Sequence, residues 1–284
     1  MILSPSNTVL TRVQAGYLTA AQPFGTWNGT VTSANLVNRY GATPNQARAI
    51  NIWRNDWQGN QLLYPTARTN SGAYTIALGG TGWTSLNGGT GTVNSATAPD
   101  GTTTASLLSD NSNATHSTHA INSNPISLSA GIWCVSCYFK HTNDQYVGIQ
   151  RQSDLFSGTF DILNGATAGS YGGDVVGTGI EASAQGYYRV WVNFDYPSAT
   201  SDGFNLCLGY GYNNLGGVGN GSTADIFGFQ VEQVASASDG PTPYIANGTS
   251  APLTLTDYTL SGTTVNLAQA PVSTATTNAT FYAT

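Results

Sequence analysis

Two cysteines spaced by two residues, Cys134 and Cys137, are the first candidates for metal or redox chemistry. The residues around them, GIWCVSCYFK (131–140), are typical of a β-strand. Side chains three positions apart in a strand point to opposite faces, so the two sulfur atoms could not bind one ion. Three cysteines are also an odd number for a disulfide framework. We therefore expect these cysteines to be packing residues.

The histidines and carboxylates give equally weak signals for catalysis. His116 and His119 resemble a fragment of a zinc site, but the surrounding Ser- and Asn-rich segment reads as a solvated loop without a glutamate partner. A glycosidase needs two carboxylates that face each other across the scissile bond. The pairs at matching spacing, Asp154 with Asp161 and Asp174 with Glu181, are seven residues apart, and an odd offset on one strand puts them on opposite faces. The sequence therefore predicts a protein that is not an enzyme and has no catalytic residues or cofactor.

Aromatic side chains in loops are the remaining candidates, because a ring face can stack on a sugar while amides and carboxylates bind its hydroxyl groups. Ordinary packing and subunit contacts are alternative roles for the same residue types. The candidate glycan-stacking residues are Trp83, Tyr146, Tyr171, Tyr210 and Tyr212.

The composition indicates the elements that must position these residues. Only 8% of the 284 residues are charged, while Gly alone contributes 34. Thr and Tyr favour strands and Gly, Asn and Ser favour turns, so we expect an all-β protein. The formal net charge of −6 and the lack of a basic run argue against nucleic-acid binding. No stretch is long and apolar enough to suggest membrane insertion, and the first residues do not resemble a signal peptide.

The chain divides into three predicted parts. Residues 1–60 form an attachment or assembly segment without a clear period, apart from a short helix over 43–53. Residues 61–248 form a β-sandwich, because strand patterns recur there without helices between them. Residues 249–284 form a small C-terminal β module. The predicted strands are 73–78, 104–108, 132–140, 146–150, 187–194, 204–210 and 225–234.

Alternation within two strands predicts their core faces. In 132–140 the core face carries Trp133, Val135, Cys137 and Phe139. In 225–234, Phe227, Phe229 and Val231 share one face, and Gly228, Gln230 and Glu232 share the other.

Five segments in order resemble a jelly-roll module of bacteriophage tail and tail-fibre proteins. They are residues 62–70 (LLYPTARTN), 96–102 (ATAPDGT), 131–140 (GIWCVSCYFK), 186–190 (GYYRV), and 226–232 (IFGFQVE) with 243–245 (PYI). Residues 257–271 (DYTLSGTTVNLAQAP) resemble a short β module that ends many tail proteins. The motif residues to which we give structural roles are Arg68, Pro99, Asp100, Gly101, Gly228 and Glu232. Of these, Arg68 and Glu232 should be partly buried and hydrogen-bonded.

The resemblance implies a jelly-roll β-sandwich similar to carbohydrate-binding modules and concanavalin-like lectins. It also implies a virion location after synthesis in the host cytoplasm, other phage structural proteins as partners, and assembly as a homotrimer. Host-surface polysaccharide is a further implied partner, and related modules often hold a structural Ca²⁺, whose ligands the sequence does not assign.

Three functions follow from the resemblance and stay open. The first is a structural component of the tail, baseplate or tail fibre. The second is a lectin-like receptor-recognition protein, and a capsid decoration or head-fibre protein is a related possibility. The third is a cellular carbohydrate-binding module cut from an enzyme, against which the tail-type C-terminal segment argues. Fold alone does not decide between them.

Overall fold

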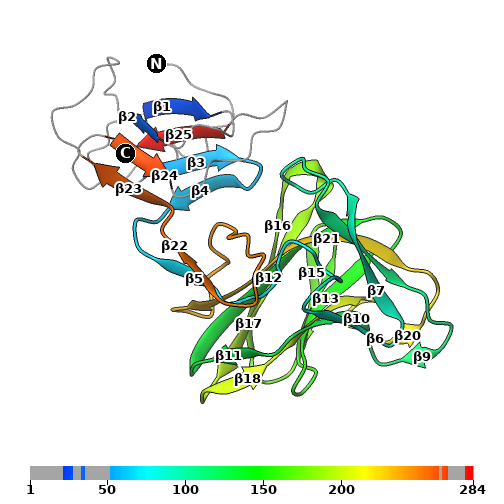
Figure 1. The fold of residues 1–284 in the computed structure, drawn as a ribbon. Helices are drawn as coiled ribbons and strands as arrows, with labels where there is room; N and C mark the ends of the chain where they lie inside the picture. The colour runs from blue at the N-terminus through cyan, green and yellow to red at the C-terminus, as the bar shows by residue number, and fades with distance from the viewer. Residues whose placement is uncertain (1–21, 28–32, 36–51, 262–263, 268–278, 284) are drawn as a thin grey trace. The chain divides into compact units, whose positions relative to one another are not determined.

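A computed structural model describes residues 22–27, 33–35, 52–261, 264–267 and 279–283. The chain forms two compact units. Unit 1 contains residues 1–68 and 255–284, and unit 2 contains residues 69–254. The strands of both can be followed in Figure 1. The described residues are all-β, with one short 3-10 turn, η1 (Ala184–Gly186).

Unit 2 is a β-sandwich of two six-stranded antiparallel sheets. The β12 sheet has the order β16–β17–β12–β21–β8–β7. Its strands are β7 (Gly89–Ala96), β8 (Ala105–Asp110), β12 (Gly131–His141), β16 (Val175–Ala182), β17 (Tyr188–Tyr196) and β21 (Thr223–Val234). The β13 sheet has the order β15–β14–β13–β19–β10–β6. Its strands are β6 (Trp83–Leu86), β10 (His119–Ser123), β13 (Tyr146–Arg151), β14 (Ser157–Asp161), β15 (Ala166–Tyr171) and β19 (Phe204–Leu208).

The strand order confirms the jelly roll. Taken in chain order, the eight central strands are β8, β10, β12, β13, β14, β17, β19 and β21. The β12 sheet contains the first, eighth, third and sixth of them side by side, and the β13 sheet the second, seventh, fourth and fifth. This alternation between two sheets defines the jelly-roll topology.

The core lies between the inner faces of the two sheets. Its largest side chains include Phe139, Phe160, Phe194, Phe204 and Phe229, none of which is exposed. The predicted core face of β12 is confirmed, since Trp133, Val135, Cys137 and Phe139 all belong to this cluster.

Short two-stranded pairings complete the described part of unit 2 and its connections to unit 1. They join β11 (Ile126–Leu128) to β18 (Thr200–Asp202), β9 (Thr115–His116) to β20 (Gly217–Val218), and β5 (Arg68–Asn70) to β22 (Leu253–Leu255).

Unit 1 is built from both ends of the chain. One sheet has the order β1–β25–β3–β4, in which β25 (Ala279–Ala283) lies between β1 (Gln22–Trp27) and β3 (Ile52–Asp56), and β4 is Gly59–Leu63. A second sheet joins β2 (Ser33–Asn35), β24 (Thr264–Leu267) and β23 (Tyr258–Ser261). The two terminal segments therefore share sheets instead of forming separate modules. Strands from one segment hydrogen-bond to the open edges of strands from the other.

The predicted helix over 43–53 falls mainly outside the described residues, and its last two residues belong to β3.

Two local predictions in unit 2 were wrong. Residues 73–78 form turns, with Tyr74 at a positive φ of 50° and Thr75 donating its backbone N–H to Asn247. Phe227 does not share the core face of Phe229. Gly228 has a φ of +67°, and the register shifts at this point of the β12–β21 pairing. Such a bulge reverses the alternation, so Phe227 packs against Tyr138 and Tyr244 instead.

Candidate functional site

One row of side chains crosses the outer face of the β13 sheet from edge to edge. The register places Tyr171 beside Ser157, Ser157 beside Gln150, and Gln150 beside Asn205. Asn205 then pairs with Asn122, and Asn122 with Thr84. Neighbouring strands lie about 4.8 Å apart, so the row spans about 24 Å. We call these six residues the polar row: Tyr171, Ser157, Gln150, Asn205, Asn122 and Thr84.

Alternation along the strands puts the polar row on the outer face. Ile149, Leu206 and Ile121 lie in the core cluster, each next to a row residue in sequence. Because successive side chains in a strand point to opposite faces, Gln150, Asn205 and Asn122 point away from the core.

The centre of the row is a hydrogen-bonded amide network. The amide of Asn205 donates to Gln150 Oε1 over 3.0 Å, and the hydroxyl of Thr118 donates to the same oxygen over 3.2 Å. Gln150 Nε2 donates to the carbonyl of Leu155 over 3.3 Å. Gln150 and Asn205 are buried, so these bonds hold the loop 152–156 against the sheet.

Two acceptors in this network have no partner among the described residues. They are Oδ1 of Asn205 and Oδ1 of Asn122, which belong to directly paired residues of β19 and β10. Buried polar atoms in native proteins are almost always hydrogen-bonded, and water or a ligand hydroxyl is the usual partner where protein groups are lacking.

The next row along the same face is apolar. It includes Gly148, Cys207, Ala120 and Leu86, and Leu215 packs over it. A Cβ atom on Gly148 would lie 2.6 Å from a methyl carbon of Leu215, so only glycine admits this approach. The loop 210–217 therefore covers the apolar row and borders the polar row.

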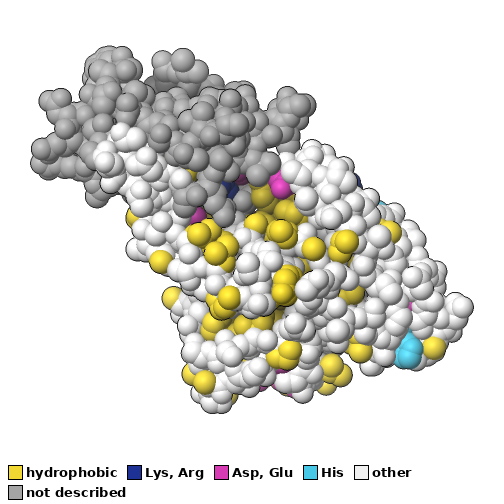
Figure 2. All heavy atoms as spheres, viewed as in Figure 1, with side chains coloured by type: hydrophobic (Ala, Val, Ile, Leu, Met, Phe, Trp, Pro, Cys, Tyr) yellow, Lys and Arg dark blue, Asp and Glu magenta, His cyan; other side chains and the backbone are white. Residues whose placement is uncertain are grey.

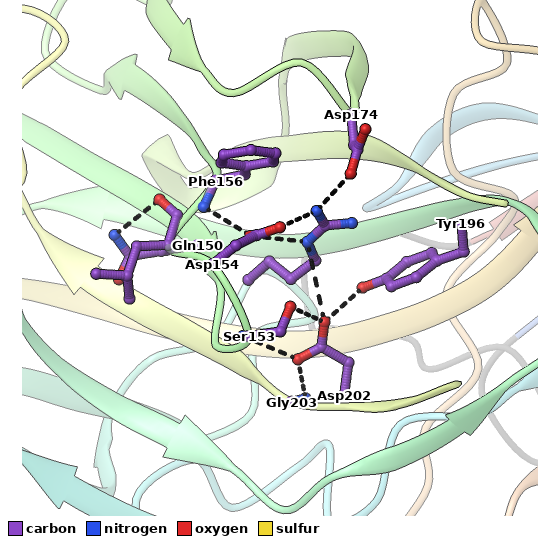
Figure 3. Close-up of polar contacts among 10 residues, drawn as sticks. Gln150, Ser153, Asp154, Phe156, Asp174, Tyr196, Asp202 and Gly203 are labelled. Carbon is purple, nitrogen blue, oxygen red and sulfur yellow. Dashed lines mark hydrogen bonds and ion pairs between the residues drawn. The ribbon is translucent and has the colours of Figure 1, made fainter. Parts of the chain in front are cut away.

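Arg151 organises the rim, which is the end of the sandwich around the loop 152–156, and it points to the face of β13 opposite to Gln150, against Phe194 and Tyr196. Its side chain is 4% exposed. Figure 3 shows Asp154, Asp174 and Asp202 around the guanidinium group from three directions. Arg151 Nε lies 2.9 Å from Asp154 Oδ1, and Nη2 lies 2.8 Å from Asp174 Oδ2 and also contacts Asp154. Burial opposes the charge of Arg151, but the hydrogen bonds that it donates to Asp154 and Asp174 outweigh burial and raise its pKa.

Aromatic rings enclose the same guanidinium. Its central carbon lies 4.9 Å from the ring centroid of Tyr196, 5.1 Å from that of Phe156 and 5.6 Å from that of Phe194. Tyr196 also donates its hydroxyl to Asp202 over 3.1 Å. Cation–π contacts with desolvated rings add to the ion pairs, so the cluster is rigid.

Tyr171 stands at the exposed side of this rim. It is 61% exposed and packs edge-on against Phe156, with ring centroids 5.9 Å apart. The side chains of Asp154 and Asp174 are 32% and 46% exposed. The rim therefore carries an exposed aromatic ring, held by Phe156, and two partly exposed carboxylates, whose positions Arg151 fixes.

The other predicted stacking residues have different surroundings. The prediction of Trp83 as a stacking residue was wrong. Its ring lies in the core against Phe229, and its Nε1 donates to the carbonyl of Tyr74. Tyr146 is half-buried at the start of β13, and Tyr210 is half-buried and donates its hydroxyl to Asp110. Tyr212 is 72% exposed in the loop 210–217.

The motif residues hold turns and buried polar contacts. Asp100 Oδ1 accepts hydrogen bonds from the N–H and hydroxyl of Thr102, while Pro99 lies in the same turn and Gly101 takes a φ of +83°. Arg68 Nη2 pairs with Asp257 over 2.5 Å. Glu232 is buried and accepts a hydrogen bond from the backbone N–H of Thr242 over 2.8 Å.

Sequence spacing did not indicate the Arg151 cluster. It paired Asp154 with Asp161 and Asp174 with Glu181, whereas the fold brings Asp154 and Asp174 to one guanidinium. Their loops are separate in the chain, so no local pattern could find them. Among the described residues, no three His, Cys, Asp or Glu side chains gather as metal ligands would. The described part of the chain also lacks a helix that is long and apolar enough to cross a membrane.

A buried carboxyl group lies at the opposite end of β13. Asp144 is 6% exposed, and only one of its oxygens, Oδ1, has a hydrogen-bond partner among the described residues. Burial raises its pKa to about 7, although backbone N–H groups of Tyr146, Gly209 and Gln145 and the charge of His141 oppose the shift. Because the folded state favours the neutral acid, this group costs stability as the pH rises from about 4 through 7.

Asp144→Asn should therefore raise the free energy of unfolding by about 3 kcal/mol at about pH 8 and leave it almost unchanged near pH 4. Urea unfolding at both pH values measures this difference. Asp161→Asn is the control: burial raises the pKa of Asp161, but hydrogen bonds from Asn164, Gln145 and the backbone N–H of Leu163 together outweigh burial and lower it. An equal change at both pH values in D144N would contradict the assignment.

The fold and the site define the chain as a jelly-roll protein with a polar, uncharged sheet face. Figure 2 shows that most of the described surface in this view carries no charged side chain. No protein-family model matches the chain, and no curated protein matches it. Solved structures that match include one from Bacteroides thetaiotaomicron VPI-5482, described as a candidate sugar-binding protein. It is 14% identical, covers 60% of this chain and 95% of its own, and has a TM-score of 0.30. A likeness this low carries no argument about fold or function.

Proposed function

We propose that unit 2 binds neutral glycans at the rim formed by Tyr171, Asp154 and Asp174, as a binding domain without catalytic activity. The observation that carries this proposal is the exposed ring of Tyr171 at the end of the polar row, beside two accessible carboxylates. A sugar ring presents an apolar face for stacking and hydroxyl groups for hydrogen bonds, and the rim offers both kinds of contact.

The polar row supports the rim through the loop 152–156. The unpartnered oxygens of Asn205 and Asn122 are buried and require donors, which ordered water can supply. Gln150 joins this row to the loop that carries Asp154, because it binds the carbonyl of Leu155. A ligand at the rim therefore meets a preorganised surface, which reduces the entropic cost of binding.

Charge at the rim narrows the ligand class. Three carboxylates surround the guanidinium of Arg151, so the formal charge of the cluster is negative. An anionic sugar would be repelled by the two exposed carboxylates, because the charge of Arg151 is already paired with them. Neutral polysaccharides fit this surface better than uronic-acid or phosphate-bearing ones.

The test is a binding titration of the whole chain with neutral cello-, xylo- and chito-oligosaccharides. Tyr171→Ala should weaken binding by about 30-fold, because truncation of an aromatic anchor costs about 2 kcal/mol. Leu163→Ala is the matched control, since Leu163 is 51% exposed after β14 and should leave affinity unchanged. Binding that survives Y171A at full strength would contradict the proposed site. Absence of binding across the panel and a wider glycan array would contradict the function.

The resemblance of the sequence motifs to tail proteins gives this proposal its setting. A virion protein of this kind would hold host-surface polysaccharide, with unit 2 as the contact domain and homotrimeric assembly with other phage structural proteins as further predictions. Purified particles should then contain the chain, and free polysaccharide that binds unit 2 should block adsorption to host cells.

A further inference from the structure

We propose that the loop 210–217 supplies a second ligand contact, Tyr212, and that Asp110 and His119 are positioning residues for this loop. This inference rests on the proposed glycan-binding function and extends the site from one stacking platform to two. It identifies the ligand as the interior of a polysaccharide chain, since one sugar at Tyr171 would not require a second platform on a separate loop.

The loop lies on the same outer face as the polar row. Leu215 packs on Ala120 and Cys207, which belong to β10 and β19 of the β13 sheet. Near the middle of the loop, Asn213 contacts β15, and a Cβ atom on Gly169 would lie 2.8 Å from the Cβ atom of Asn213. Only glycine permits this approach, so the side chain of Asn213 lies directly against β15.

This contact brings the two exposed tyrosines to one face. Tyr212 precedes Asn213, and Tyr171 lies two residues after Gly169 on β15. Chain geometry then limits the distance between the Cα atoms of Tyr171 and Tyr212 to about 17 Å. These are the two most exposed large hydrophobic side chains among the described residues, at 61% and 72%. A chain of several sugar units can span both rings.

A buried pair of titratable groups fixes both ends of the loop. Asp110 and His119 are completely buried, and His119 Nδ1 lies 3.1 Å from Asp110 Oδ1. The first loop residue, Tyr210, donates its hydroxyl to Asp110. The last, Gly217, has its carbonyl 3.0 Å from His119 Nε2, which must carry the proton because a carbonyl only accepts.

The position of Tyr212 therefore depends on groups that touch no ligand. Asp110 ends β8, which belongs to the β12 sheet, and His119 begins β10 of the β13 sheet. Ser112 donates its backbone N–H to Asp110 Oδ1 over 2.9 Å, so the carboxylate is itself held in place. Loss of the bond between Tyr210 and Asp110 releases the start of the loop, while the core of the sandwich, elsewhere in the unit, is unchanged.

The experiment compares a disaccharide and a hexasaccharide of the neutral series that binds most tightly, using the full chain. Tyr212→Ala should lower affinity for the hexasaccharide about tenfold and leave affinity for the disaccharide unchanged. Tyr210→Phe, which keeps the ring and removes only the hydroxyl, should lower hexasaccharide affinity in the same direction. In a Y212A background it should have no further effect, because it acts only through Tyr212. Asp110→Asn is a second, more disruptive variant of the same contact.

The outcomes separate this inference from the proposed function. Wild-type hexasaccharide affinity in Y212A, together with loss of binding in Y171A, would overturn the second platform and leave the glycan site standing. If the double variant Y210F/Y212A lost as much hexasaccharide affinity as the two single variants combined, the positioning role of Asp110 would be overturned. No binding of either sugar by the unmodified chain would overturn the function itself.

Discussion

Replacement of Asn70 by alanine should lower the free energy of unfolding of unit 2 by about 4 kcal/mol, one of the two largest losses of stability that we expect. The Asn70 side chain is completely buried and makes four hydrogen bonds to backbone groups. It donates to the carbonyls of Phe229 and Ile245, and it accepts from the N–H groups of Gly72 and Val231. Alanine leaves all four groups without that partner, and each unsatisfied buried group costs about 1–3 kcal/mol.

Urea unfolding followed by tryptophan fluorescence measures this effect. Asn111→Ala is the matched control, because Asn111 is exposed and its side chain makes one long hydrogen bond of 3.4 Å to Thr90. The control should change stability by less than about 0.5 kcal/mol. Asn70→Asp, which keeps the acceptor oxygen and loses both donors, should also be destabilising. A loss below about 1 kcal/mol in N70A would show that the four bonds are not the reason for the Asn in this motif.

The second large effect is expected at Arg151. Arg151→Met should cost about 3–5 kcal/mol, because it leaves the buried carboxylate of Asp202 without its cation. Asp202 is 4% exposed, and its remaining partners are Ser153, Tyr196 and the backbone N–H of Gly203. Arg151→Lys should recover little, since an ammonium group cannot reproduce the fork that binds two carboxylates at once.

The double variant R151M/D202N tests the cause. If the uncompensated carboxylate is responsible, neutralising it should restore about 1–2 kcal/mol of the loss. Lys140→Met serves as the control, because Lys140 makes a cation–π contact with Tyr187 at 5.6 Å and is only partly buried. An R151M variant as stable as the unmodified chain would mean that the guanidinium is dispensable to the rim. R151M should also weaken glycan binding, since Asp154 and Asp174 lose the group that fixes them.

Composition and strand spacing predicted the all-β sandwich of unit 2, whereas the jelly-roll topology was implied by the resemblance of the motifs. Strands such as β12, β13 and β17 could be predicted from the sequence because they are rich in β-branched and aromatic residues and are bounded by turn residues. Gly228 shows the limit of this reasoning. One residue at positive φ shifts the register and moves Phe227 to the outer face, and nothing in the local pattern marks the glycine as a bulge.

Pairings between distant segments account for the other differences. β25 lies between β1 and β3, so the ends of the chain share a sheet that no local signal indicates. Residues 73–78 have strand composition, but their backbone bonds go to the segment around Asn247 and Thr249. Tertiary contacts decided these elements and overrode their local preference.

The candidate site was predictable only in part. Tyr171 was among five aromatic residues that fit a stacking role. Burial in the structure shows that Trp83 belongs to the core and Tyr171 to the surface, a difference that the sequence did not indicate. The polar row depends on the register of six strands, and three of the five pairings between them (β13–β19, β19–β10 and β10–β6) join strands that are not consecutive in the chain. Asp174 reaches Arg151 only because the loop after β15 folds toward the loop after β13.

The most direct test of the glycan site is a residue-resolved NMR titration of the chain with the neutral oligosaccharide that binds best. We expect the ring resonances of Tyr171 and the side-chain amide resonances of Gln150 and Asn205 to shift together, with one dissociation constant. Shifts confined to other surfaces, with the Tyr171 and amide resonances unmoved at saturation, would contradict it.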